Sequence, residues 1–190
     1  LPMFTEKLSH RAQRDLEKMG VIVKLNTAVQ EVKPRTILVK DADSIPSEVT
    51  IWAAGVKGEP TGAILNLPLD GSRIEVDPTL AVSHYPYVWA IGDISGAKDA
   101  DGRFLPQVAP VALQQGKFVG VQILRLAAGK ALTPFKYRDK GSMATIGRHK
   151  AVVQVGKFTM TGIPAWYAWL WLHLFYLLGG SNKIGTMADW

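Results

Sequence analysis

The stretch Val88-Trp89-Ala90-Ile91-Gly92-Asp93 carries the most information about the fold. Its apolar residues predict a buried β-strand that ends abruptly at Gly-Asp. A glycine at such a point allows the backbone to approach a ligand closely. Ligands of open α/β sheets bind outside the carboxyl ends of the strands, which is where Asp93 would lie. The stretch therefore predicts an α/β fold with a ligand site at Gly92 and Asp93, although the same pattern also occurs as a plain turn.

Helix and strand patterns alternate upstream of this stretch. Thr5 is a candidate N-cap for a helix that reaches Met19, and Gly20 is a candidate left-handed stop. Residues 21–25 and 29–32 are predicted strands, and residues 36–39 complete a hairpin-like arm. Residues 49–55 are almost continuously apolar, which is typical of a strand buried on both faces of a parallel sheet.

Downstream, a long helix is predicted from the first turn at Pro110 to Gly129, followed by short strands between residues 135 and 160. Residues 163–178 are the apolar maximum of the chain. As a helix they would span roughly 24 Å, which is short of the ~30 Å hydrocarbon core of a bilayer. Their Trp and Tyr content favours a helix lying in the membrane interface, with a core or oligomer-interface helix as the alternative.

Composition excludes several classes of site. The 190 residues, 47% apolar and 20% charged, are ordinary for a globular chain, and the absence of Cys excludes disulfides, Cys-ligated zinc and iron–sulfur clusters. The four His residues lack ligand-like spacing, so no metal site is predicted. From residue 134 onward, seven basic residues stand against two acidic ones, which gives +5 of the net +6. Basic charge beside a Trp-rich apolar segment favours an anionic lipid surface over nucleic acid.

Six segments, taken in order, carry a family resemblance over essentially the whole chain. They resemble the type II (alternative, non-proton-pumping) NADH:quinone oxidoreductases at Leu1-Pro2-Met3-Phe4, Trp52-Ala53-Ala54-Gly55-Val56, Trp89-Ala90-Ile91-Gly92-Asp93, Val108-Ala109-Pro110-Val111-Ala112-Leu113-Gln114-Gln115-Gly116, Lys140-Gly141-Ser142-Met143-Ala144-Thr145-Ile146-Gly147 and the Trp-rich tail. The Gly-Asp element alone is shared by the wider pyridine nucleotide-disulphide oxidoreductase-like superfamily of FAD/NAD(P)-binding proteins.

The resemblance implies part of an α/β flavoprotein with two Rossmann-like dinucleotide-binding domains and a C-terminal membrane-associated helical region. It assigns residues 1–60 to the end of the NADH-binding domain, 61–133 to the second segment of the FAD-binding domain, and 134–190 to the membrane-associated region. The family's two Gly-x-Gly-x-x-Gly phosphate loops are absent from this sequence. Because the chain also lacks an initiator Met and stops beside an apolar stretch, we expect it to be an internal piece that is inactive alone.

The same resemblance implies the FAD contacts. Asp93 would hydrogen-bond the ribityl hydroxyls, and Gly92 would let the backbone approach. Val111 and Ala112 would place the positive end of a helix at the flavin pyrimidine ring. Lys140 would be the catalytic cation, stabilising the reduced flavin or donating into a water chain toward the quinone. Each of these positions is also compatible with ordinary packing or with a solvated side chain.

NADH and quinone contacts follow in the same way. Ala54, Gly55 and Val56 would lie against the nicotinamide half of NADH. Four residues would border the quinone site: Ala109, Pro110, Gln114 and Met143. Many members of the family carry Ala-Gln where this chain has Ala109-Pro110, so Gln114 is the nearer candidate for an amide bond to the quinone.

The implied activity is FAD-dependent transfer of electrons from NADH to a membrane quinone, without proton pumping. The implied location is the cytoplasmic face of the inner membrane, held by residues 163–179, and a homodimer is a further expectation. A soluble NAD(P)H-dependent ferredoxin or rubredoxin reductase is the alternative enzyme, but it would not need the Trp-rich tail. A membrane-surface binding domain without a cofactor is the alternative that is not an enzyme.

Overall fold

The computed structural model describes Leu1, residues 3–177 and residues 179–188. The chain forms two compact units, one made of Leu1–Ile51 with Lys140–Trp190 and the other of Trp52–Asp139. The first unit thus combines the two ends of the sequence. The sequence-based division at residues 60/61 and 133/134 differs from these unit boundaries, and its assignment to cofactor domains stays a prediction.

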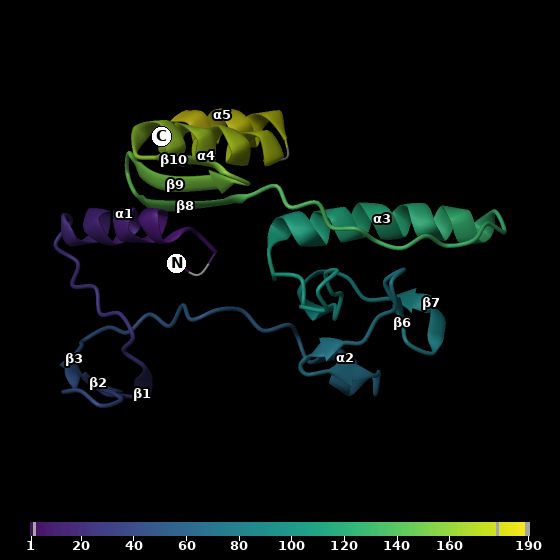
Figure 1. Cartoon of the computed structure of the whole chain (residues 1–190), viewed down its shortest axis with the longest axis horizontal. Coiled ribbons are helices and arrows are strands. Elements are labelled where there is room, and N and C mark those ends of the chain that lie inside the picture. Colours follow the sequence, from purple (N-terminus) through teal and green to yellow (C-terminus); the bar gives the residue numbers. More distant parts are fainter. Residues whose placement is uncertain (2, 178, 189–190) are drawn as a thin grey trace. The chain divides into compact units, whose positions relative to one another are not determined.

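A three-stranded antiparallel sheet is the centre of the first unit. It has the order β10–β9–β8, with β8 at Ser142–Gly147, β9 at Lys150–Val155 and β10 at Phe158–Thr161. Helix α1 (Glu6–Glu17) lies on one side of this sheet and helix α4 (Ile163–Tyr176) on the other (Figure 1). Successive side chains of a β-strand point to opposite faces of its sheet. In β9, Val152 therefore packs against α1, whereas Ala151 and Val153 pack against Ala165 of α4.

Helix α1 confirms the predicted helix and its stop. Gly20 has φ +85°, and the amide of Val21 donates to the carbonyl of Leu16, which is the hydrogen bond of a Schellman motif. Thr5 is the N-cap residue, but the prediction that its side chain caps the helix is wrong. Its backbone amide instead donates to Oε1 of Gln154 at 2.9 Å, so this end of the helix is fixed to strand β9.

The predicted hairpin arm is confirmed. Strands β1 (Val29–Lys33), β2 (Thr36–Val39) and β3 (Ile45–Pro46) pair antiparallel in that order. Lys33 pairs with Thr36 across a two-residue turn, in which Arg35 takes a left-handed conformation with φ +60°.

Two predicted strands are absent from the described structure. Residues 21–25 and 49–55 are extended or irregular, and no described strand pairs with them. Their apolar side chains face solvent, with Ile22 85% and Ile51 87% exposed. A strand is stable only when its backbone groups are hydrogen-bonded to a neighbour, so an apolar run without a partner does not form one.

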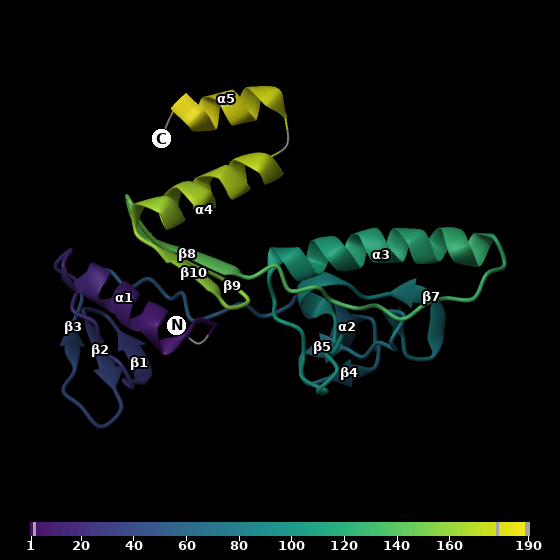
Figure 2. The ribbon, with the colours of Figure 1, turned by 45° about the horizontal axis from the view of Figure 1, so that its top comes forward.

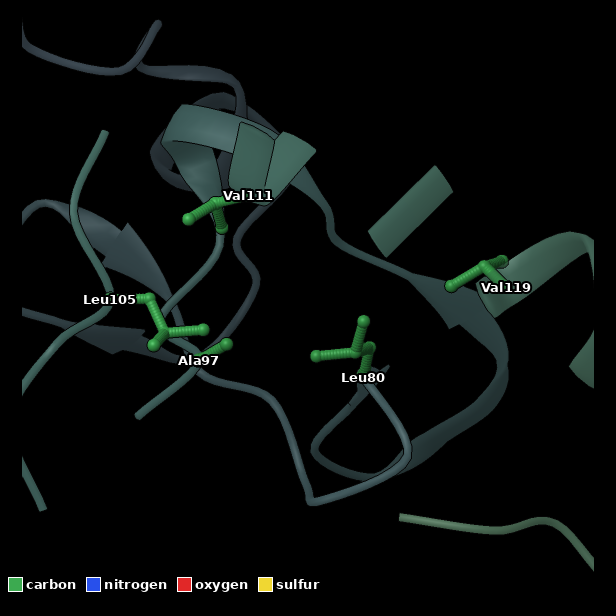
Figure 3. Close-up of a cluster of buried hydrophobic side chains, with 5 residues drawn as sticks. All are labelled: Leu80, Ala97, Leu105, Val111 and Val119. Carbon is green, nitrogen blue, oxygen red and sulfur yellow. The ribbon is translucent and has the colours of Figure 1, made fainter. Parts of the chain in front are cut away.

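The second unit is built around helix α3 (Ala109–Ala127), which confirms the long predicted helix. Its short elements are α2 (Thr61–Ile64), the antiparallel pairs β4–β5 (Leu69–Asp70, Arg73–Ile74) and β6–β7 (Ala81–Val82, Tyr85–Trp89), and the 3-10 helix η1 (Gly92–Ile94). Figure 3 shows its main core, in which Val111 and Val119 of α3 pack with buried residues of the loops, namely Leu80, Ala97 and Leu105.

Strand β7 corrects the prediction of a buried strand before Gly92. It pairs only with β6 among the described strands, and Tyr85, Tyr87 and Val88 are exposed. Burial begins at Ala90, which is 2% exposed. The ladders between the described strands are antiparallel, and the only parallel pairing among the described residues is an isolated bridge between Ile74 and Ser95. The parallel sheet predicted around residues 49–55 is therefore not formed by the described residues.

The apolar tail is helical, as predicted. Helix α4 is followed by α5 (Gly180–Ala188), which packs beside it (Figure 2). Over the described part of the chain, no helix combines the length and the apolar character needed to cross a membrane.

Candidate functional site

The Gly92-Asp93 turn is fixed by a buried amide side chain. Gly92 has φ +70°, a left-handed conformation that favours glycine, and it opens helix η1. Its backbone amide donates to Oε1 of Gln115 at 2.7 Å, and Gln115 is only 1% exposed. A buried hydrogen bond of this kind costs about 1–3 kcal/mol to leave unmade. Helix α3 therefore holds the turn in one position.

Two further segments approach the same turn. Gly58 is buried, and a Cβ placed there would lie 3.0 Å from the carbonyl oxygen of Asp93 and 3.1 Å from the side chain of Ile94. Gln107 donates from Nε2 to that same carbonyl at 2.9 Å. The backbone after Gly92 is thus held by Gln107 as well as by α3, and Gly58 packs against it so closely that a larger residue would crowd it.

The carboxylate of Asp93 is available to a ligand. Asp93 is exposed, and among the described residues none donates a hydrogen bond or forms an ion pair with its side chain. A carboxylate has about four acceptor positions, which suits the hydroxyl groups of a polyol. The rigid backbone and the free carboxylate together form a positioned acceptor.

The start of α3 lies next to this acceptor. A Cβ at Gly92 would be 3.6 Å from Cβ of Ala112, so the two segments are in contact. The N-cap residue, Val108, makes no side-chain cap. The amides of Val111 and Ala112 both donate to its carbonyl, at 3.0 and 3.4 Å, and the Val111 side chain is buried in the core of Figure 3. The amides of Val111 and Ala112 could therefore bond a cofactor only by sharing their hydrogens with the carbonyl of Val108. The positive end of the helix dipole would attract an anionic group without such hydrogen bonds.

Residues Ala54, Gly55 and Val56 are exposed on the segment that precedes Gly58. Gly55 has φ +110°, and a Cβ there would meet nothing within 4 Å. The backbone conformation at Gly55, and not crowding, is what requires glycine. The three predicted NADH contacts thus lie in the same unit as the Gly92-Asp93 turn.

The predicted quinone contacts are divided between the two units. Ala109 and Pro110 form the first turn of α3. The amide of Gln114 is already engaged, because Nε2 donates to the carbonyl of Arg138 at 3.0 Å and Oε1 accepts from its amide at 3.1 Å. Gln114 therefore ties residues 134–139 to α3, and a quinone would have to share or replace these hydrogen bonds.

Lys140 and Met143 belong to the other unit. Lys140 is exposed, and its Nζ donates to Oη of Tyr176 at 3.4 Å. Met143 lies in β8 and packs into the core between the sheet and α4, against Ala151, Val153 and Ala165. Among the described residues, no group of His, Cys, Asp and Glu side chains is arranged to hold a metal ion.

Gln115 and Gly58 are site residues that the sequence-based prediction did not include. One face of α3 carries buried residues at helical spacing, namely Val111, Gln115, Val119 and Gln122. Two Gln residues on a buried face signal that each amide has a partner, since buried polar groups are nearly always hydrogen-bonded. No comparable signal in the sequence singles out Gly58.

Comparisons with known proteins agree on one family. The pyridine nucleotide-disulphide oxidoreductase family matches residues 1–116. The chain is 39% identical to a type II NADH:quinone oxidoreductase of Mycobacterium tuberculosis, over 100% of this chain and 42% of that protein. It is 32% identical to an internal alternative NAD(P)H-ubiquinone oxidoreductase of Arabidopsis thaliana mitochondria, over 100% of this chain and 41% of that protein. The chain thus spans about two fifths of the length of these relatives.

A solved structure has the same fold. The NDH2 of Plasmodium falciparum in complex with NADH superimposes on all of this chain with a TM-score of 0.87, over 55% of its own length and at 16% identity. At this identity the likeness concerns the fold alone.

Proposed function

Because the chain belongs to the pyridine nucleotide-disulphide oxidoreductase family, we propose that it is part of a flavoenzyme that passes electrons from NADH to a quinone. The observation that carries this proposal is the Gly92-Asp93 turn, held by Gln115 with its carboxylate exposed. The sequence identity of 39% and 32% to two such oxidoreductases, which extends over all of this chain, supports the choice of activity.

The residues of the turn fit FAD. FAD, when bound, would supply the chemistry of accepting a hydride from NADH and delivering two electrons to the quinone. Asp93 would accept hydrogen bonds from the ribityl hydroxyls, and Gly92 would leave room for the chain of the cofactor. The positive end of α3, at Val111 and Ala112, favours negative charge on the flavin ring. Ala54, Gly55 and Val56 leave space for the nicotinamide ring.

Lys140, Gln114 and Met143 complete the proposal on the quinone side, with Ala109 and Pro110. Lys140 holds a positive charge and a donor on a short loop, and Tyr176 fixes its side chain. Gln114 acts by holding the backbone of Arg138. No side chain is needed as a general base, because the cofactor carries out the redox step and the protein positions the reactants.

The exposed side chains of helix α4 support attachment to a membrane surface, which we propose to be the cytoplasmic face. Tyr167, Trp171 and Phe175 are 51%, 65% and 76% exposed, although apolar side chains of this size are usually buried. Residues 163–179 would insert this face into the interface beside the lipid-soluble acceptor.

Replacing Phe175 by Ser removes one anchor and should weaken binding to vesicles about tenfold. Replacing Ile64, 73% exposed in the other unit, by Ser is the matched control and should have no effect.

The first test uses full-length protein and the flavin absorbance band. NADH should bleach this band, and a short-chain quinone should restore it. Reoxidation only by ferredoxin-like acceptors would support the soluble reductase, and a preparation without flavin would support the binding domain.

Asp93→Ala should weaken FAD binding about tenfold or more, because a charged acceptor is lost. Asp101→Asn, which alters a surface ion pair with Arg103 in the same unit, should leave FAD binding unchanged.

A further inference from the structure

A cavity of about 290 Å³ lies in the first unit, and none of the proposed FAD, NADH or quinone contacts lines it. It is bounded by the turn between β8 and β9, by one face of α4 and by α5. Trp166, Leu170, Trp171 and Met187 make most of its wall apolar, and Arg148 and His149 contribute a guanidinium and an imidazole ring. Its volume is near the lower end of the roughly 300–1,000 Å³ of small-molecule sites.

The polar part of the wall is a two-residue hairpin turn. Arg148 and His149 form the two-residue connection between paired Gly147 and Lys150. His149 has φ +62°, a conformation in which glycine would cost less. The His149 ring packs edge-on against Trp166, with centroids 4.7 Å apart and planes at 79°.

We propose that this cavity binds one anionic phospholipid, with part of an acyl chain against the aromatic wall and the phosphate beside Arg148 and His149. The charge balance supports this occupant: from residue 140 onward the sequence has five basic residues and one acidic residue. A guanidinium has five N–H donors, so Arg148 can bond a phosphate while it keeps its present partner. An uncharged isoprenoid quinone would use the apolar wall but gain nothing from the charge of Arg148.

The test measures lipid retention by delipidated full-length protein in mild detergent. Native mass spectrometry would count dioleoyl-phosphatidylglycerol or dioleoyl-phosphatidylcholine bound per chain. We expect one phosphatidylglycerol, bound at least about tenfold more tightly than phosphatidylcholine. Equal retention of the two lipids, or retention of neither, would overturn the proposal. So would displacement of phosphatidylglycerol by a long-chain quinone with no preference between the lipids.

Two variants locate the site. Arg148→Gln and His149→Gly should each weaken phosphatidylglycerol binding about tenfold. His149→Gly suits the left-handed backbone, so the fold should be retained and its thermal unfolding temperature should not fall. Lys157→Gln removes another exposed cation, in the turn between β9 and β10, and is the matched control. If Lys157→Gln lost as much phosphatidylglycerol binding as Arg148→Gln, the lipid would be held by general charge attraction, and the proposed binding in the cavity would be refuted.

This result is separable from the proposed activity. Electron transfer to a short-chain, water-soluble quinone does not require a bound lipid. Loss of lipid retention with normal NADH oxidation would refute the lipid site alone, and normal retention without NADH oxidation would refute the redox assignment alone.

Discussion

Gln115 connects the longest helix of the second unit to the turn that carries Asp93. We expect Gln115→Leu to destabilise the protein by about 1–3 kcal/mol, because the amide of Gly92 would be buried without a partner. Gln122→Leu is a matched control, since Gln122 is equally buried in α3 but bonds Thr133. Chemical unfolding should show similar losses for both variants, whereas FAD release should be faster only in Gln115→Leu. If both variants released FAD at the same rate, Gln115 would affect FAD only by stabilising the fold as a whole.

The hydroxyl of Tyr137 makes the free energy of unfolding depend on pH in the alkaline range. Burial raises the pKa of its hydroxyl, and the negative charge of Asp139 raises this pKa further. The folded state therefore binds the proton more tightly than the unfolded state, whose Tyr pKa is about 10. The resulting stability is fully present below about pH 10 and is lost as pH rises through the folded pKa. The unfolding free energy of Tyr137→Phe should fall less steeply above pH 10, and parallel curves would contradict the assignment.

Sequence patterns located the ligand turn but not the residues that fix it. Gly92-Asp93 could be predicted because a strand end and a glycine are local signals. The partner of Gln115 is a backbone amide 23 residues away, so its identity depends on the packing of α3. Gly58 is required by a contact with residues 93 and 94, which no local pattern reports.

At the scale of elements, the entry into strand β8 depends on Gly141. It has φ +87°, and a Cβ there would collide with the carbonyl of Gln154 and lie 2.9 Å from Cα of Val155. Gly141→Ala should therefore destabilise the protein by about 3 kcal/mol. Gly156→Ala is the control: its φ of +56° is also left-handed, but a Cβ would meet nothing within 4 Å, so the cost should be about 1 kcal/mol. Thermal unfolding distinguishes the two, and equal losses would contradict a steric role for Gly141.

Elements whose stability is local could be predicted, and those that need a distant partner could not. Helices α1 and α3 follow from apolar spacing and glycine stops, α4 follows from the apolar run at residues 163–178, and the β1–β2 hairpin follows from its turn. Residues 21–25 and 49–55 have the composition of strands but no described partner. Apolar composition measures the tendency to be buried, and pairing decides whether a strand forms.

At the scale of the whole molecule, residues 49–55 are expected to pair in the full-length protein, whose relatives are more than twice as long as this chain. If their additional length supplies neighbouring strands, the amides of 49–55 should exchange about a hundredfold more slowly than those of the exposed turn at residues 41–44. Hydrogen–deuterium exchange followed by mass spectrometry would measure this difference. Similar exchange in both segments would show that residues 49–55 are a loop.

The position of β9 between α1 and α4 has a consequence for biosynthesis. The amide of Thr5 finds its acceptor on Gln154, 149 positions later. At 5–20 residues per second, a ribosome needs roughly 7–30 s to make the intervening chain. During that time the apolar face of α1, including Leu8 and Ala12, has no strand to cover it. The nascent chain therefore exposes the apolar face of α1 until β9 has been made, and a message truncated between the codons of these two elements would yield a product that lacks the strand that covers this helix.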